Sequence, residues 1–335
     1  MMPIGFSGEA LCGVAARGSH QSTAATLTLV ASLASHFTIA PLRLLRENIY
    51  VNRLTTLLIV AHACVAAQHR YLVSGLVLSL DPPHRSVLVS HESIPGYMDA
   101  MTMAFRVATV KDLAALHAGD TVSFTLVVDK NSSWAENIQV VEFDSAERDP
   151  VLANRLKLLG SLMEKNAALA LSPGDPIPDF TLTDQANHPV TFSAFAGKVV
   201  ALNFVYTRCP LPDYCFRLSN NLGQLQKRFA AGRDLVLLTV TFDPVNDQPD
   251  VLAKYAQVWK ANPAMWHFLT GPVPQIQHLC ALFGVGYWPD EGLYTHSLHT
   301  AVIDRKGRLV ANLEGNRYTA RQLGDLVETV INRPR

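Results

Sequence analysis

The sequence predicts a multidomain protein in which a small all-β barrel precedes an α/β domain. The chain has 335 residues, enough for two domains of ordinary size. Its apolar fraction of 49% and charged fraction of 17% allow a sizeable buried core. Short strand-like segments follow one another in the first part of the chain, whereas strands and helices alternate in the second.

Residues 1–68 are interpreted as a presequence. One positive charge at Arg53, an apolar stretch from Leu54 and small residues ahead of Gln68 form the three parts of a secretory signal at about 51–67. Because fifty residues precede this signal, we expect translation to start near Val51. We therefore expect export to the periplasm, and the alternative is a membrane anchor formed by an uncleaved N-terminal segment.

Residues 69–144 are predicted to form the barrel. Its strand-like segments are Tyr71–Leu80, Ser86–Glu92, Met103–Val107, Thr121–Val128 and Ile138–Phe143. Alternation places His91 on one face of its strand and Met101 and Met103 on one face of theirs, so pairing the two strands brings these groups together. With Met98 they supply one imidazole and three thioethers, which soft Cu(I) prefers. The alternative is that the methionines only fill the core.

The stretch from His91 to Phe105 resembles the periplasmic copper-binding modules of the CusF type, which are small OB-like barrels. In that family a histidine and both methionines of a Met-x-Met pair bind Cu(I) beneath a tryptophan. The resemblance implies that His91, Met101 and Met103 are ligands. Met98 stands where the tryptophan would be and offers a fourth soft ligand.

Residues 145–172 are predicted to be a linker with a short amphipathic helix, because Leu156, Leu159 and Leu162 recur at helical spacing. The α/β domain is predicted at 173–335. Its expected strands are Val199–Tyr206, Leu235–Phe242, Trp266–Leu269 and two around the turn at Asp304, and its expected helices are Cys215–Ala231, Pro249–Val258, Val273–Phe283 and one from Thr319.

Two cysteines, Cys209 and Cys215, stand where the first long strand of this domain passes into a helix. This position is typical of the thioredoxin fold, and a helix N-terminus there stabilises a thiolate. Cys280 belongs to an amphipathic helix pattern and is interpreted as a small core residue.

The segment Phe204-Val-Tyr-Thr-Arg-Cys209-Pro-Leu-Pro-Asp-Tyr-Cys215, with Phe242-Asp-Pro-Val-Asn-Asp and His296-Ser, resembles the Sco/SenC family. Members are thioredoxin-fold copper chaperones that help to assemble the copper centre of cytochrome oxidase. The resemblance implies that Cys209, Cys215 and His296 bind copper, with His296 in a loop before the strand that begins at His299. The family's cysteines have three residues between them, whereas this pair has five. A structural disulfide is the alternative for the pair.

Together the two clusters predict a periplasmic copper chaperone that captures Cu(I) in the barrel, passes it to the cysteines and delivers it to a client such as an oxidase subunit. A periplasmic thiol reductant is an expected partner, because the cysteines must be reduced to bind the ion. The alternatives are a thiol–disulfide oxidoreductase that uses Cys209 and Cys215 as a redox pair, and a protein that only sequesters copper. Equal numbers of basic and acidic residues, 28 of each, give no electrostatic reason to expect nucleic acid as a partner.

Overall fold

The computed structural model describes residues 68–141 and 169–334, which all belong to one compact unit, Ala66–Arg335. Residues 1–67 of the predicted presequence and residues 145–168 of the predicted linker lie outside the described residues. No helix in the described ranges is long and apolar enough to span a bilayer.

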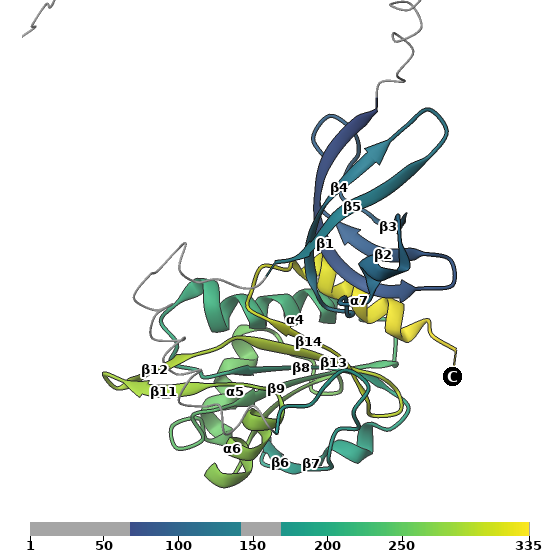
Figure 1. Ribbon diagram of the computed structural model, residues 1–335. Helices are drawn as coiled ribbons and strands as arrows, with labels where there is room; N and C mark the ends of the chain where they lie inside the picture. Colours follow the sequence, from purple (N-terminus) through teal and green to yellow (C-terminus); the bar gives the residue numbers. More distant parts are fainter. Residues whose placement is uncertain (1–67, 142–168, 335) are drawn as a thin grey trace, which may run out of the picture. The chain divides into compact units, whose positions relative to one another are not determined.

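Five strands form the first domain (Figure 1). They are β1 (His69–Asp81), β2 (Ser86–His91), β3 (Thr102–Arg106), β4 (Thr121–Val128) and β5 (Ser133–Val140). The strands pair antiparallel in the order β3-β2-β1-β4-β5. A bridge between Val107 and Ala135 joins the two outer strands, so that the sheet closes on itself. This confirms the predicted small all-β domain.

The prediction for the last strand of this domain was wrong. The expected strand was Ile138–Phe143, whereas β5 covers Ser133–Val140. Asn137 has a positive φ of 55°, and the register with β4 shifts beside it. Such a bulge breaks the alternation of apolar and polar residues that would have revealed the strand.

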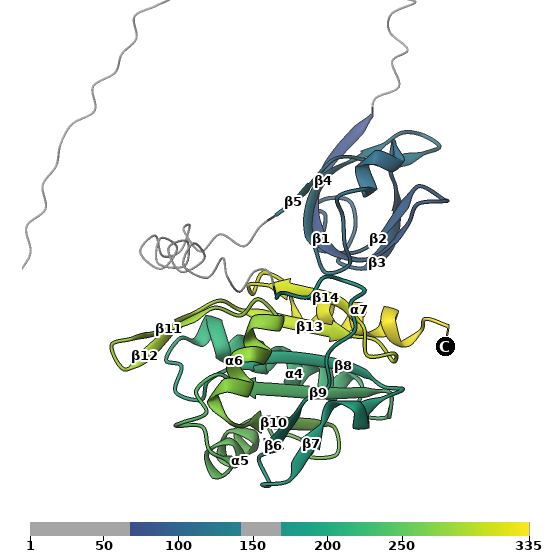
Figure 2. The same ribbon diagram turned by 60° about the horizontal axis from the view of Figure 1, so that its bottom comes forward.

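The second domain is a seven-stranded mixed sheet with helices on both faces (Figures 1 and 2). Its sheet strands are β6 (Thr181–Asp184), β7 (Pro189–Thr191), β8 (Val199–Val205), β9 (Leu235–Thr241), β10 (Trp266–Thr270), β13 (His299–Ile303) and β14 (Leu309–Glu314). Its helices are α4 (Arg217–Arg228), α5 (Pro249–Val258), α6 (Val273–Leu282) and α7 (Ala320–Ile331). The helices α4 and α7 pack together on one face of the sheet. The predicted α/β thioredoxin-like architecture is confirmed.

The ends of several strands lie together at one edge of this sheet. The order is β14-β13-β8-β9-β10-β6-β7, with β8, β9 and β10 parallel and β13 antiparallel to β8. Every residue of β8 and β9 is buried, which explains their continuous apolar sequence. Segments that follow β8 and β9, and the segment that precedes β13, therefore meet at the same edge, where ligands bind in open α/β sheets.

Three features of the second domain differ from the prediction. The helix expected from Cys215 begins only at Arg217, because Pro212–Phe216 forms a separate π-helical turn. The strands β6 and β7 were not predicted. A two-stranded hairpin, β11 (Tyr287–Asp290) and β12 (Leu293–His296), was also missed, and it makes His296 the last residue of a strand instead of a loop residue.

Strand β1 contributes to two hydrophobic cores. Val73 and Val77 belong to the core of the first domain, whereas Leu76 and Leu78 belong to the core of the second. All four side chains are at most 1% exposed. Burial on both faces explains why the segment around Leu76–Leu78 has a continuous apolar run instead of an alternating pattern.

Candidate metal centres

Two cysteines and a histidine converge at the edge where β8 and β9 end. Cys209 follows β8, Cys215 lies in the π-helical turn and His296 ends β12. The two sulfur atoms and a ring nitrogen of the histidine all lie within 4.8 Å of one another, and this is the one such group of three found among the described residues. Cys215 Sγ lies 3.5 Å from His296 Nε2. We call this group the Cys–Cys–His cluster.

The orientation of the histidine suits a metal ligand. Its Nδ1 donates to the carbonyl oxygen of Ser297 at 2.9 Å, which leaves Nε2 facing the sulfurs as the free donor atom. A backbone partner on the other ring nitrogen is the usual way in which proteins fix a ligating imidazole. His296 is 4% exposed, so the ring is already oriented inside the protein.

The turn between the cysteines gives them different exposure to solvent. Pro212 begins a π-helical turn, and Tyr214 has non-helical angles of φ −108° and ψ −111° within it. The turn buries Cys215 to 1% exposure, whereas Cys209 stays partly exposed. Their sulfurs are not bonded to each other. One sulfur is therefore open to exchange with a partner while the other is enclosed.

The two cysteines also differ in the pKa of their thiols. Hydrogen bonding from Cys215, followed by the interaction with His296, lowers the pKa of the Cys209 thiol. Burial, followed by the neighbouring Cys209 thiolate, raises the pKa of Cys215. At neutral pH the apo-protein thus presents one thiolate and one thiol, and binding a metal through both sulfurs releases a proton.

Aromatic rings enclose the histidine. The ring of Tyr206 meets that of His296 edge to face, with centroids 5.7 Å apart, and Phe242 lies at 4.9 Å. Tyr206 is 1% exposed, and its hydroxyl is a hydrogen-bonding neighbour of Cys209 as well as an acceptor for the backbone N–H of Tyr294. These rings exclude water from one side of the cluster and hold the imidazole in place.

Two buried carboxylates support the loop that carries Cys209. Asp247 accepts hydrogen bonds from the backbone N–H and hydroxyl of Thr207 and from the hydroxyl of Thr241. Asp243 pairs with Arg208, whose guanidinium also donates to the carbonyl oxygen of Gly292 in the hairpin. In the sequence, this segment was notable only for its resemblance to the Sco/SenC family. Its position directly after β9 is the feature that could have placed these acids at the edge of the sheet where the site lies.

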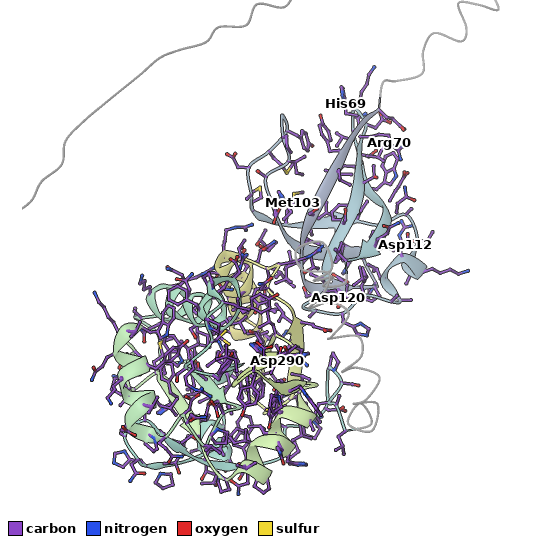
Figure 3. The ribbon with its side chains drawn as sticks, turned by 90° about the vertical axis from the view of Figure 1, so that its left-hand side faces the viewer. His69, Arg70, Met103, Asp112, Asp120 and Asp290 are labelled. Carbon is purple, nitrogen blue, oxygen red and sulfur yellow. The ribbon has the colours of Figure 1, made fainter. Side chains whose placement is uncertain are left out.

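The first domain brings the other predicted residues to one end of β2 and β3. Val89 pairs with Met103, and the backbone N–H of His91 donates to the carbonyl oxygen of Met101 at 2.9 Å. A bridge between Ile94 and Met98 folds the connecting loop back beside them. Figure 3 labels Met103 on this domain and shows yellow sulfur atoms close to it. The predicted pairing of these strands is confirmed, and the ligand roles stay predictions.

The histidine of this group, which we call the His–Met cluster, has an unpaired buried atom. His91 is 0% exposed, and its Nδ1 donates to the carbonyl oxygen of Glu92 at 2.6 Å. Its Nε2 has no hydrogen-bond partner among the described residues. A buried nitrogen without a partner is costly in a folded protein, and a metal ligand has this arrangement before the ion arrives. Met101 is 49% exposed, so the cluster has an opening toward solvent.

Two residues weighed from the sequence lie outside both clusters. Cys280 is 1% exposed in α6, and burial raises the pKa of its thiol. His299 begins β13 as expected, and burial lowers its pKa to about 4. Neither belongs to the group of three donors, so His296 is the histidine that the fold brings to the cysteines.

A thioredoxin-like domain with two cysteines and a histidine at its sheet edge follows a small β-domain in which a histidine and methionines lie together, so the chain carries two groups of the side chains that soft metals prefer. The family model described as SCO1/SenC matches residues 171–332, and the model described as copper binding periplasmic protein CusF matches residues 70–140. The second domain is accordingly an SCO1/SenC domain, and the first is a CusF-like domain.

Curated relatives match the second domain. "Protein sco1" of Schizosaccharomyces pombe is 28% identical over 141 residues, which are 39% of this chain and 52% of that protein. "Protein SCO2 homolog, mitochondrial" of Mus musculus is 31% identical over 112 residues, 32% of this chain and 42% of that protein. The chain spans about half the length of the curated relatives it matches.

Solved structures match the same half of the chain. Yeast Sco1 with copper bound is 26% identical and covers 49% of this chain and 91% of its own, with a TM-score of 0.41. BsSco, described as a member of the Sco family of cytochrome c oxidase assembly proteins, is 22% identical and covers 49% of this chain and 99% of its own, with a TM-score of 0.42.

Proposed function

We propose that this protein is a periplasmic copper chaperone with two copper sites, which delivers the ion to a client such as the copper centre of cytochrome c oxidase. The observation that carries the proposal is the convergence of Cys209, Cys215 and His296 within 4.8 Å in an SCO1/SenC domain. Two sulfurs and an imidazole are a donor set that soft Cu(I) prefers. The CusF-like domain, with His91, Met98, Met101 and Met103, supports a second site for the same ion.

The two clusters suit successive steps of copper handling. Thioethers bind Cu(I) without losing a proton, so the methionines of the His–Met cluster take up the ion without a deprotonation step. The Cys–Cys–His cluster adds negatively charged sulfur and holds the ion more firmly. Partial exposure of Cys209 leaves one ligand open to exchange with the client. Ligand exchange through this sulfur is the proposed route of delivery.

Anaerobic titration of the reduced full-length chain with Cu(I), against a chelator of known affinity, tests both sites. We expect two ions per chain. Cys209→Ser or His296→Ala should remove one ion, and His91→Ala should remove the other. Cys280→Ala is the matched control, because this cysteine is buried away from both clusters, and it should retain two ions. The proposal is wrong if the reduced chain takes up no Cu(I), or if X-ray absorption finds no sulfur neighbours around the bound metal.

The cellular location of the protein and the identity of its client are tested in two separate experiments. Cell fractionation should recover the protein from the periplasm, as the signal-like segment at about 51–67 predicts. Deletion of the gene should lower the copper content of the oxidase, and the wild-type chain should restore it while Cys209→Ser should not. Recovery from the cytoplasm alone would contradict the periplasmic part of the proposal.

A second candidate function is reduction of client disulfides, with a periplasmic thiol reductant as partner. The lowered pKa of Cys209 beside the enclosed Cys215 is what a nucleophilic and a resolving thiol require. Cys209 would attack the client disulfide, and Cys215 would then displace the client thiol and close an internal disulfide. Rapid reduction of a model disulfide substrate by the copper-free protein would favour this function over copper delivery.

A further inference from the structure

Side chains of α7, in the second domain, hold the backbone that carries the His–Met cluster of the first. Arg321 Nη2 donates to the carbonyl oxygen of His91 at 2.7 Å. Gln322 Nε2 donates to the carbonyl oxygen of Ser90 at 3.0 Å. Ser90 and His91 are both 0% exposed and Gln322 is 3% exposed, so the Gln322 contact is shielded from water, whereas the Arg321 side chain is 37% exposed. Two successive carbonyl groups of β2, those of Ser90 and His91, are therefore both held by one helix.

A single carboxylate on the same helix joins the two strands of the His–Met cluster. Asp325 Oδ2 accepts from the hydroxyl of Ser90 in β2 at 2.7 Å and from the hydroxyl of Thr102 in β3 at 3.0 Å. Ser90 and Thr102 are paired across the strands, in the position next to His91 and Met101. Because successive side chains alternate between faces, this polar pair lies on the face opposite the metal donors.

The carboxylate is itself fixed from two sides. Arg321 Nη1 lies 3.1 Å from Asp325 Oδ2, and Arg228 Nη1 of α4 lies 2.8 Å from Asp325 Oδ1. Gly324 makes room for the second contact, since a Cβ there would meet Arg228 Nη1 at 2.5 Å. Partial burial alone would raise the pKa of Asp325, but hydrogen bonds from Ser90, Arg228 and Thr102, with the charge of Arg228, keep it below its usual range. The acceptor thus stays charged and in place at neutral pH.

We infer that α7 is the positioning element of the first domain's copper site, in which Arg321 and Asp325 hold β2 and β3 at the separation that lets His91, Met101 and Met103 reach one ion. The inference rests on the proposed copper site of the first domain and adds a role for the second domain in it. Residues that orient metal ligands without touching the metal contribute about 10- to 100-fold to metal affinity. Asp325 meets this description, because its carboxylate fixes both strands of the His–Met cluster from the face opposite the donors.

Contacts from α7 and Cu(I) bound at the His–Met cluster should strengthen each other. If contacts from α7 increase the affinity of the His–Met cluster for Cu(I), the bound ion must stabilise those contacts by the same factor. Copper in the first domain therefore restrains a helix of the second. Such coupling needs no movement of the ion between the sites, and it can be measured with the second site disabled.

The test uses the full-length chain carrying Cys209→Ser and Cys215→Ser, in which only the His–Met cluster can bind Cu(I). Adding Arg321→Ala should weaken Cu(I) binding about 10- to 100-fold, as measured by competition with a chelator. Thr102→Val removes one contact to Asp325 from an exposed position with little change in shape, and it should weaken binding in the same direction. Arg308→Ala is the matched control, because this arginine donates to the carbonyl oxygen of Gly174 within the second domain, and it should bind normally.

A second measurement separates positioning from general stability. Adding Cu(I) to the protein with both serine substitutions should slow hydrogen exchange of the amides of α7, and Arg321→Ala should abolish this effect. Unchanged Cu(I) affinity in both Arg321→Ala and Thr102→Val overturns the inference while leaving the proposed function intact. If the chain with both serine substitutions takes up no Cu(I), the proposed first site is wrong and the inference falls with it.

Discussion

At the scale of single residues, Cys209 and Cys215 are chemically different although both face the same space. Hydrogen bonding from Cys215 lowers the pKa of Cys209, while burial raises that of Cys215. A thiolate reacts with alkylating agents, whereas a buried thiol does not. The pair therefore has a built-in order of reactivity, which the spacing of the cysteines in the sequence does not reveal.

This difference predicts the order of alkylation. In the copper-free, reduced protein at mildly acidic pH, iodoacetamide should modify Cys209 first and leave Cys215 and Cys280 largely unmodified. Peptide mass spectrometry over time measures the order. Cu(I) should protect Cys209 when it binds at the Cys–Cys–His cluster. Equal rates for Cys209 and Cys215 would contradict the described inequality.

The buried ring of His299 should make the stability of the protein depend on pH. Its folded-state pKa of about 4 lies below the value of about 6.5 for an unfolded chain, because the ring is buried. The unfolded state therefore binds more protons between these values, and stability must fall as the pH drops from about 6.5 to about 4. The contribution lost is about 3 kcal/mol at 1.36 kcal/mol for each unit of pKa.

Urea unfolding of the copper-free protein at several pH values measures this effect. His299→Gln should be less stable near neutrality, where the neutral ring packs well, but its stability should decline less on acidification across this range. His188 is exposed and provides the control, since His188→Gln should leave the pH dependence unchanged. A parallel decline in His299→Gln and the wild type would show that other groups cause the acid sensitivity.

At the scale of elements, the loop after β9 fixes the loop after β8. Asp247 is 0% exposed and accepts three hydrogen bonds, two of them from Thr207, which stands two residues before Cys209. An aspartate in this position replaces the water that would otherwise solvate the end of β8. The position of Cys209 thus depends on a residue outside the cysteine segment.

Asp247→Asn tests this dependence. The amide nitrogen cannot accept from Thr207 or Thr241, so at least one buried donor loses its partner, which costs about 1–3 kcal/mol in the free energy of unfolding. Cu(I) affinity at the Cys–Cys–His cluster should fall as well, because Cys209 is less well held. Asp250→Asn is the control, since Asp250 is an exposed residue of α5. Urea unfolding and Cu(I) competition measure the two effects.

Most helices and strands of the second domain could be predicted because their apolar residues follow clear patterns in the sequence. Pro249–Val258 was predicted with its observed bounds, and the apolar runs of β8 and β9 were placed within a residue. The pattern failed where local geometry overrides it. Asn137 interrupts β5 with a bulge, and Tyr214 has non-helical angles within the π-helical turn that precedes α4. The hairpin of β11 and β12 is mostly half-buried and lacks apolar alternation, so His296 was expected in a loop.

The side chains of the two candidate clusters were predictable from the sequence, whereas the residues that support them were not. Sulfur and imidazole groups are rare enough that their spacing and resemblance indicated both clusters. Ser90, Thr102 and Asp325 are ordinary polar residues, and Asp325 lies more than two hundred positions from the other two in the chain. Only the folded arrangement of β2, β3 and α7 brings them together, so the contacts that hold the His–Met cluster have no local signature.

At the scale of the whole molecule, β1 contributes to the hydrophobic cores of both domains. Its side chains at Val73 and Val77 fill the core of the first domain, and those at Leu76 and Leu78 fill the core of the second. Neither core is complete without this strand. We therefore expect the described part of the protein to unfold in a single transition, since loss of one domain exposes apolar surface of the other.

Leu78→Asp tests this shared strand. The side chain of Leu78 is 0% exposed, and a carboxylate placed there without a partner costs several kcal/mol in the interface with the second core. Because Leu78 points away from the core of the first domain, that domain should stay folded while the second is weakened, and calorimetry should resolve two transitions in place of one. Leu72→Asp is the matched control, because Leu72 lies on the same strand but is 73% exposed, and it should unfold like the wild type. Two well-separated transitions in the wild type would contradict the expected single unfolding transition of the two domains.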